Sequence, residues 1–116
     1  MFLELAHTKL DVFKVTKIFV LSCYRETKSF PPEEKFGIIS QIRRAALSVH
    51  LNVAEGCSRK SANERKRFYE IARGSIVEID AALDISVELG YTSKQQLEDL
   101  AKFMIRSFQL ISKLIS

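Results

Sequence analysis

Three short breaks divide the chain into four long stretches that carry the spacing of α-helices. The breaks are Pro31-Pro32, Ser58 to Ser61 and Gly90 to Ser93, and no proline lies inside the stretches between them. Apolar residues recur there at intervals of three and four, without the alternation of period two that marks strands. The predicted helices span residues 8–29, 33–59, 62–89 and 94–115. Because short connections make neighbouring helices antiparallel, we predict an all-α fold, an antiparallel up-down-up-down four-helix bundle.

Capping residues stand at two of these breaks. Ser61 with Glu64, and Ser93 with Gln96, fit the capping box, in which a hydroxyl and a side chain three residues later satisfy free backbone N–H groups. Gly90 fits the C-terminal cap of the third helix. These residues predict where the third helix begins and ends and where the fourth begins.

Length and composition fit one domain spanning residues 1–116. The chain is 47% hydrophobic and 28% charged, with a formal net charge of +4. A chain of this size buries roughly two-thirds of its unfolded surface, so it needs neither disulfides nor a metal to fold. No apolar run approaches the ~20 residues that span a bilayer, and the start of the chain lacks a signal-peptide pattern. We expect a cytoplasmic protein with no membrane partner and with reduced Cys23 and Cys57.

The residue spacing assembles no catalytic or metal-binding set. His7 and His50 have no Glu or His at metal-ligand spacing, and Cys23 and Cys57 belong to no C-x-x-C pair. The glycines form no phosphate-binding loop and no dinucleotide fingerprint. The Glu-x-x-His pairs of di-iron bundles are also missing. We expect neither enzymatic activity nor a cofactor or metal.

The predicted first helix carries apolar residues on two sides. One stripe runs from Leu10 to Tyr24, and a second stripe lies nearly opposite to it. The second stripe consists of Val12, Val15, Phe19 and Cys23. Because such a helix has more apolar surface than one small bundle covers, we expect this second stripe at an interface between copies of the chain. The alternative is that these are single apolar residues at the surface, with Phe19 covered by a loop.

Basic residues crowd the connection between the second and third predicted helices. This basic turn comprises Arg59, Lys60, Arg65, Lys66 and Arg67, diluted only by Glu64. Cations at one end of a bundle can hold a nucleic-acid backbone without reading its bases. A second candidate surface, on the fourth predicted helix, comprises Lys102, Arg106 and Lys113. The alternative for the basic turn is an ordinary solvated connection.

Polar residues also follow one side of the second predicted helix. This polar stripe comprises Arg44, Ser48, Asn52, Glu55 and Arg59. Ser and Asn are poor helix formers that usually bond a local partner, and Glu55 and Arg59 are spaced for an ion pair. We interpret Asn52, Glu55 and Arg59 as a buried or half-buried network rather than as a ligand site. This network should join the second helix to the third near Glu78 or Arg73. In the helical pattern Glu78 lies between Ile71 and Ile85 rather than among the exposed acids of the third helix.

The same region resembles a known protein family. The run from Gln41 to Gly56, QIRRAALSVHLNVAEG, followed by Arg59, resembles the signature of the 23S rRNA intervening-sequence proteins, which are small bacterial four-helix bundles. Further matches are the Phe30-Pro31 break, Phe68, Ile71 to Ser75, Glu78 and Leu89 to Tyr91. His50 stands where many members carry proline. The resemblance therefore does not decide whether the second helix is kinked at this position.

The resemblance implies more than a fold. A related branch, the accessory proteins of diversity-generating retroelements, forms basic homopentamers that bind nucleic acid and a reverse transcriptase. The resemblance therefore implies a homo-oligomer, with five subunits as the expected number. Together with the basic turn it predicts binding of RNA or DNA without strong sequence selectivity. The alternative is a scaffold that holds a protein partner, favoured by the acidic face of the third helix and by the lack of aromatic residues among exposed arginines.

Overall fold

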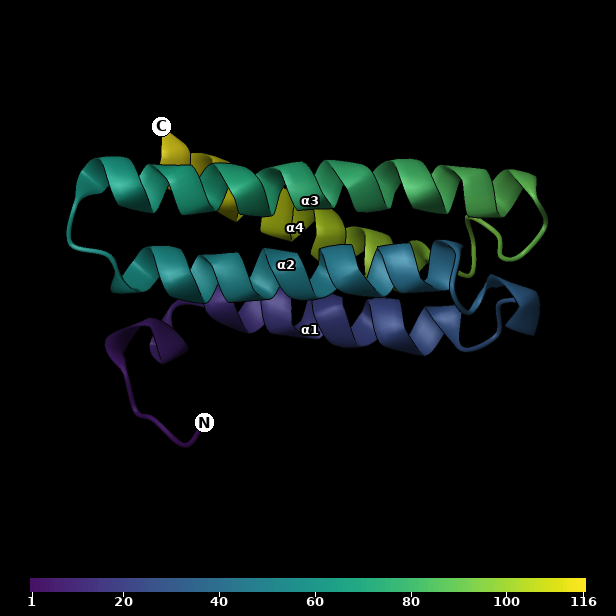
Figure 1. The fold of residues 1–116 in the computed structure, drawn as a ribbon, viewed down its shortest axis with the longest axis horizontal. Coiled ribbons are helices and arrows are strands. Elements are labelled where there is room, and N and C mark those ends of the chain that lie inside the picture. Colours follow the sequence, from purple (N-terminus) through teal and green to yellow (C-terminus); the bar gives the residue numbers. More distant parts are fainter.

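The computed structural model covers residues 1–116 and consists of helices and their connections. Its α-helices and short 3-10 helices are η1 (Ala6–Lys9), α1 (Asp11–Thr27), η2 (Pro32–Glu34), α2 (Ile38–Ser58), α3 (Ala62–Glu88) and α4 (Glu98–Ile115). Figure 1 shows α1, α2 and α3 side by side, with α4 behind them. Consecutive helices pack together and α4 returns to contact α1, so α1 and α3 lie diagonally opposite. The predicted all-α bundle is confirmed.

The core lies along the axis between the four helices. Each helix contributes a side chain that is fully buried, such as Phe19 of α1, Ile42 of α2, Ile79 of α3 and Ile111 of α4. Burial of one such side chain contributes roughly 1.5–3 kcal/mol. The apolar faces of the helices therefore stabilise the bundle. None of the helices has both the length and the apolar character needed to cross a membrane.

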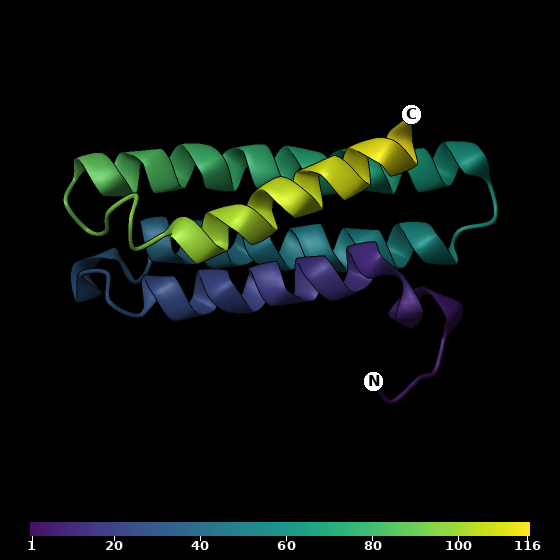
Figure 2. The same cartoon turned by 180° about the vertical axis from the view of Figure 1, so that it is seen from behind.

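The second apolar stripe of α1 belongs to this core, so its prediction as an outer interface was wrong. Phe19 and Cys23 are fully buried, Val12 is buried and Val15 is half-buried. The reason is that α4 packs along α1, as the view from behind shows (Figure 2). Burial also raises the pKa of the Cys23 thiol to about 12. The side of α1 that remains exposed carries Leu21 instead.

Three helices begin later than the sequence predicts. α1 begins at Asp11 rather than at residue 8. α2 begins at Ile38 rather than at residue 33, because the chain turns at Gly37 after the separate helix η2. The Glu34 carboxylate accepts a hydrogen bond from the Ile38 backbone N–H at 3.2 Å and thereby caps α2. α4 begins at Glu98 rather than at residue 94. α2 is one continuous helix through His50.

The caps of α3 are those that the sequence predicts. The Ser61 hydroxyl accepts a hydrogen bond from the Glu64 backbone N–H at 3.2 Å at the start of the helix. Gly90, just past its end, has a φ of 80°, a left-handed conformation that glycine adopts without strain. Ser93 also accepts a bond from the Gln96 N–H at 3.1 Å, but it caps a turn that precedes α4.

Helices α2 and α3 come into close contact where Gly56 meets Tyr69. A Cβ atom on the buried Gly56 would lie 2.6 Å from a carbon of the Tyr69 ring, so a larger residue there would force the ring or the helices to shift. The Tyr69 hydroxyl donates to the Cys57 sulfur at 3.5 Å. Burial raises the pKa of the Tyr69 hydroxyl, and the hydrogen bond to Cys57 raises it further. The glycine that ends the matched run Gln41 to Gly56 therefore serves helix packing.

Tyr91 joins the two connections at the other end of the bundle. Its hydroxyl donates to the Glu34 carboxylate at 2.7 Å, and its ring lies 5.7 Å from that of Phe30, centroid to centroid. The hydrogen bond to Glu34 raises the pKa of Tyr91. The Glu34 carboxylate is thus engaged on both oxygens, by Tyr91 and by the start of α2.

Candidate nucleic-acid interface

The basic turn forms the connection between α2 and α3, at the left of Figure 1. Arg65 holds this connection in shape, because its guanidinium donates to the backbone carbonyls of Arg59 at 3.1 Å and Lys60 at 2.7 Å. The Ser61 cap of α3 lies between these residues. Arg65 therefore positions the turn and has fewer N–H donors left for a ligand.

Arg59 is also engaged within the chain. It forms an ion pair with Glu55 at 3.4 Å, and its guanidinium lies 4.9 Å from the centroid of the Phe68 ring. The ion pair is about half exposed on both sides, and pairs of that kind contribute at most about 1 kcal/mol. Arg59 thus contacts α3 through an aromatic ring, while its charge is partly balanced by Glu55.

The remaining cations of the turn, Lys60, Lys66 and Arg67, are exposed and form no ion pair. On α4, Lys102, Arg106 and Lys113 are exposed as well. The C-terminal end of α4 lies at the same end of the bundle as the basic turn (Figure 1), so Lys113 extends that charged end. The structure therefore brings the turn cations together and leaves part of the cluster free.

The polar stripe forms a smaller network than predicted. The Asn52 side chain donates to the Ser48 carbonyl at 2.8 Å and to the Ser48 hydroxyl at 3.1 Å. The Ser75 hydroxyl of α3 donates to the Ser48 hydroxyl at 3.0 Å. These hydrogen bonds are partly buried, and the Ser48–Ser75 bond is the one that joins α2 to α3 within the stripe.

Other parts of that prediction were wrong. Glu55 and Arg59 are exposed on the outside of the bundle, and Glu78 is exposed and bonds none of them. Arg73 donates instead to the Ser112 hydroxyl of α4 at 3.4 Å. Arg44 and Glu78 face one shallow groove of about 270 Å³ without forming an ion pair. The reason is that α2 presents the end of its polar stripe to solvent rather than to α3.

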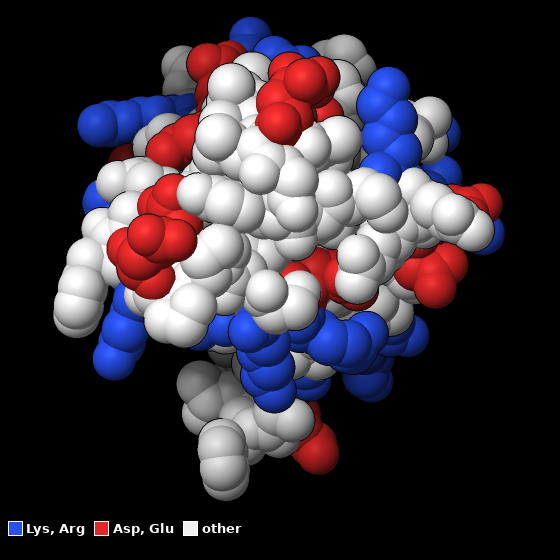
Figure 3. Space-filling view, turned by 90° about the vertical axis from the view of Figure 1, so that its right-hand side faces the viewer, with Lys and Arg blue, Asp and Glu red and all other residues white.

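The outward sides of α1 and α3 carry opposite charge together with exposed apolar side chains. The basic face of α1 comprises Lys14, Lys17, Ile18, Leu21, Arg25 and the adjoining Lys28. The acidic face of α3 comprises Glu70, Ile71, Val77, Glu78, Asp80, Asp84, Ile85 and Glu88. Figure 3 views the bundle from the end opposite the basic turn. It shows blue side chains gathered along the lower side, where α1 lies, and red side chains interspersed with blue ones above.

The acidic side of the third helix was recognised in the sequence, but the basic face of α1 and the exposed aliphatic residues of α3 were not. The available signal was the spacing of Ile71, Glu78 and Ile85, which places apolar and acidic residues on one outward line of α3. Ile71, Val77 and Ile85 are 43%, 56% and 52% exposed. Ile71 and Ile85 lie on that line, whereas Val77 lines the groove between α3 and α4.

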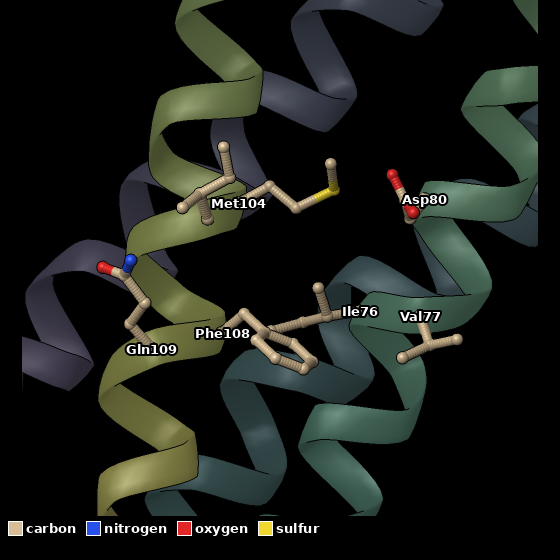
Figure 4. Close-up of a pocket in the computed structure, with 7 residues that line it drawn as sticks. Ile76, Val77, Asp80, Met104, Phe108 and Gln109 are labelled. Atoms are coloured by element: carbon tan, nitrogen blue, oxygen red, sulfur yellow. The ribbon is translucent and has the colours of Figure 1, made fainter.

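A largely apolar groove of about 380 Å³ lies between α3 and α4. Figure 4 shows the Met104 and Phe108 side chains reaching from α4 toward α3, where Ile76 and Val77 lie, with Asp80 at the edge. Its lining contains no basic residue. No three side chains of metal-binding type lie close enough together to hold a metal ion.

These features define a small antiparallel four-helix bundle with a basic end and oppositely charged outer faces. A family model of the 23S rRNA-intervening sequence proteins matches residues 8–113, and the chain belongs to this family. It is similar in structure to a protein of unknown function from the S23 ribosomal protein family of Bacteroides thetaiotaomicron VPI-5482. The TM-score is 0.80 at 18% identity, over 90% of this chain and 98% of that chain, which shows a shared fold. No curated protein matches the chain.

Proposed function

We propose that this protein is a non-catalytic homo-oligomer that binds the phosphate backbone of RNA or DNA through the basic turn. The observation that carries the proposal is the group of unpaired cations Lys60, Lys66 and Arg67 on a turn that Arg65 holds in shape. A preformed site loses less conformational entropy on binding than a mobile one. Contacts of this kind position a backbone and carry no sequence code.

The two charged faces support assembly of the chain with copies of itself. The basic face of α1 and the acidic face of α3 lie on diagonally opposite helices, and each also exposes aliphatic side chains. Opposite charge favours the correct encounter, and apolar burial stabilises the contact. Such a contact joins two different surfaces, so it forms a ring when the rotation between subunits closes. The subunit number five comes from the family resemblance.

The test of the proposal is the salt dependence of binding to fluorescein-labelled RNA and DNA. Phosphate binding must weaken steeply as salt rises, because each contact releases condensed counterions. The triple variant Lys60→Glu, Lys66→Glu, Arg67→Glu should lose binding at moderate salt. The matched control, Lys102→Glu, Arg106→Glu, Lys113→Glu, carries the same change in charge and should bind better than the turn variant. Equal binding by the turn variant and the parent would show that the basic turn is not the site.

Assembly is tested separately by light scattering. An oligomer that dissociates when Ile71 and Ile85 are both replaced by Asp is the expected result. A 13.3 kDa particle at micromolar concentration of the parent would refute assembly.

The groove between α3 and α4 favours a second candidate function, a scaffold that holds an apolar segment of a protein partner. This function replaces the first if no nucleic acid binds in a salt-dependent way.

A further inference from the structure

A second basic site lies at the end of the bundle opposite the basic turn. It is a cleft of about 420 Å³ between the second half of α1 and the first half of α2, including the connection before α2. Its aromatic, basic and apolar lining includes Tyr24, Lys35, Phe36, Arg43, Arg44 and Leu47. No acidic residue lines the cleft, and the nearby Glu34 is held by Tyr91 and the start of α2.

Phe36 gives this cleft an exposed aromatic ring. Its side chain is 89% exposed. The predicted helix 33–59 includes Phe36, but α2 begins only at Ile38 and leaves Phe36 in the preceding turn. The Lys35 ammonium lies 5.5 Å from the centroid of the Phe36 ring. An aromatic face beside a cation is therefore open to solvent.

Arg43 forms a fixed part of the cleft. Its Nε donates to the Thr27 hydroxyl at 2.9 Å, and its Nη2 donates to the Tyr24 carbonyl at 3.2 Å. The same guanidinium lies 4.9 Å from the centroid of the Tyr24 ring. Arg44, the next residue, is exposed and forms no ion pair. The cleft thus combines one anchored guanidinium with two cations that form no ion pair, Lys35 and Arg44.

We propose that this cleft binds an unstacked base of single-stranded nucleic acid, an inference that rests on the proposed function. Phe36 offers a face for the base, and Lys35 and Arg44 lie where they can contact the flanking phosphates. Aromatic rings beside a positive groove bind single strands, because each base has a face that can stack. In a duplex both faces of a base are covered by its neighbours, so the cleft selects single strands over duplexes.

The cleft is tested by comparing a labelled poly(U) strand with a duplex of equal length. Phe36→Ala should weaken binding of the single strand by about tenfold and leave binding of the duplex unchanged. Phe108→Ala, which removes a partly exposed ring from the groove between α3 and α4, is the matched control and should change neither. Equal single-strand affinities of the two variants would overturn the proposal.

A second variant gives a direct signal. The chain contains no tryptophan, so Phe36→Trp adds a single indole that reports on the cleft. Its fluorescence should be quenched by poly(U), also when the basic turn carries the three Glu substitutions and the strand is in excess. Unchanged fluorescence at saturation would overturn the cleft while the proposed function stands. If the parent binds neither the single strand nor the duplex, both proposals fail. A change in particle size caused by Phe36→Ala would overturn the cleft as a nucleic-acid site and assign it to contacts between copies of the chain.

Discussion

Replacement of Gly56 by alanine is expected to force a methyl group into the Tyr69 ring. The added Cβ atom would lie 2.6 Å from Cε1 and 2.9 Å from Cδ1 of Tyr69, and 3.2 Å from Cβ of Phe68. The Tyr69 side chain is only 5% exposed, so its ring has little room to turn away. Either α2 and α3 separate locally or Tyr69 leaves its preferred rotamer.

The size of the effect follows from two opposing contributions. Overpacking of a core costs about 1–3 kcal/mol, whereas Gly→Ala inside a helix gains up to about 1 kcal/mol. Gly56 lies close to the end of α2, where that gain is smallest. We therefore expect Gly56→Ala to lower the free energy of unfolding by about 1–2 kcal/mol. In the Tyr69→Val background the clash with the ring is absent and only the milder contact with Cβ of Phe68 stays, so the same substitution should be close to neutral.

The assay is urea unfolding followed by far-UV circular dichroism, at one protein concentration for all variants. The double-mutant cycle should give a coupling free energy of about 1–3 kcal/mol between positions 56 and 69. Gly74→Ala is the matched control, because a Cβ atom there meets nothing within 4 Å, and it should stabilise α3 by about 0.5–1 kcal/mol. An identical cost of Gly56→Ala in both backgrounds would refute the steric reasoning.

Four further predictions concern single side chains. Phe19→Ala should cost about 3–5 kcal/mol at every protein concentration; a cost that varied with concentration would place Phe19 between copies. Burial lowers the pKa of His50 below 6.5, so the unfolded chain takes up its proton first, and stability should fall as the pH drops below that value. His50→Gln should weaken this fall, and an unchanged pH profile would contradict it. A thiol reagent at mildly alkaline pH should modify the half-buried Cys57 and spare Cys23, whereas equal rates would mean that α1 and α4 separate readily. Glu55→Ala should cost less than about 1 kcal/mol in urea unfolding, because its ion pair is exposed; a larger loss would require a buried partner.

The fold was accessible from the sequence because its signals are local. The helix predicted at 62–89 is α3, Ala62–Glu88, since a serine cap and a glycine C-cap act within one turn of its ends. The start of α2 was not accessible in this way. It depends on Glu34, whose carboxylate caps Ile38, and on Tyr91, which is distant in the sequence and holds that carboxylate.

The candidate sites were accessible only in part, for a related reason. The cations of the basic turn are neighbours in sequence, so their clustering followed from the chain itself. The engagement of Arg65 with the Lys60 carbonyl depends on the folded turn. Periodicity also showed that α1 has two apolar stripes, but it does not say which of them α4 covers. The exposure of Phe36 was hidden by the late start of α2.

The placement of the basic turn and the Phe36 cleft at opposite ends of α2 gives the molecule a direction. The 21 residues of α2 separate the two ends by about 30 Å. In a ring with cyclic symmetry whose bundles run parallel to the ring axis, every subunit points the same way. One rim would then collect the lysines and arginines of the turns and the other rim the aromatic clefts. A strand of nucleic acid would then meet lysine and arginine side chains on one rim and aromatic stacking surfaces on the other. A dihedral assembly would place both on each rim and abolish this polarity.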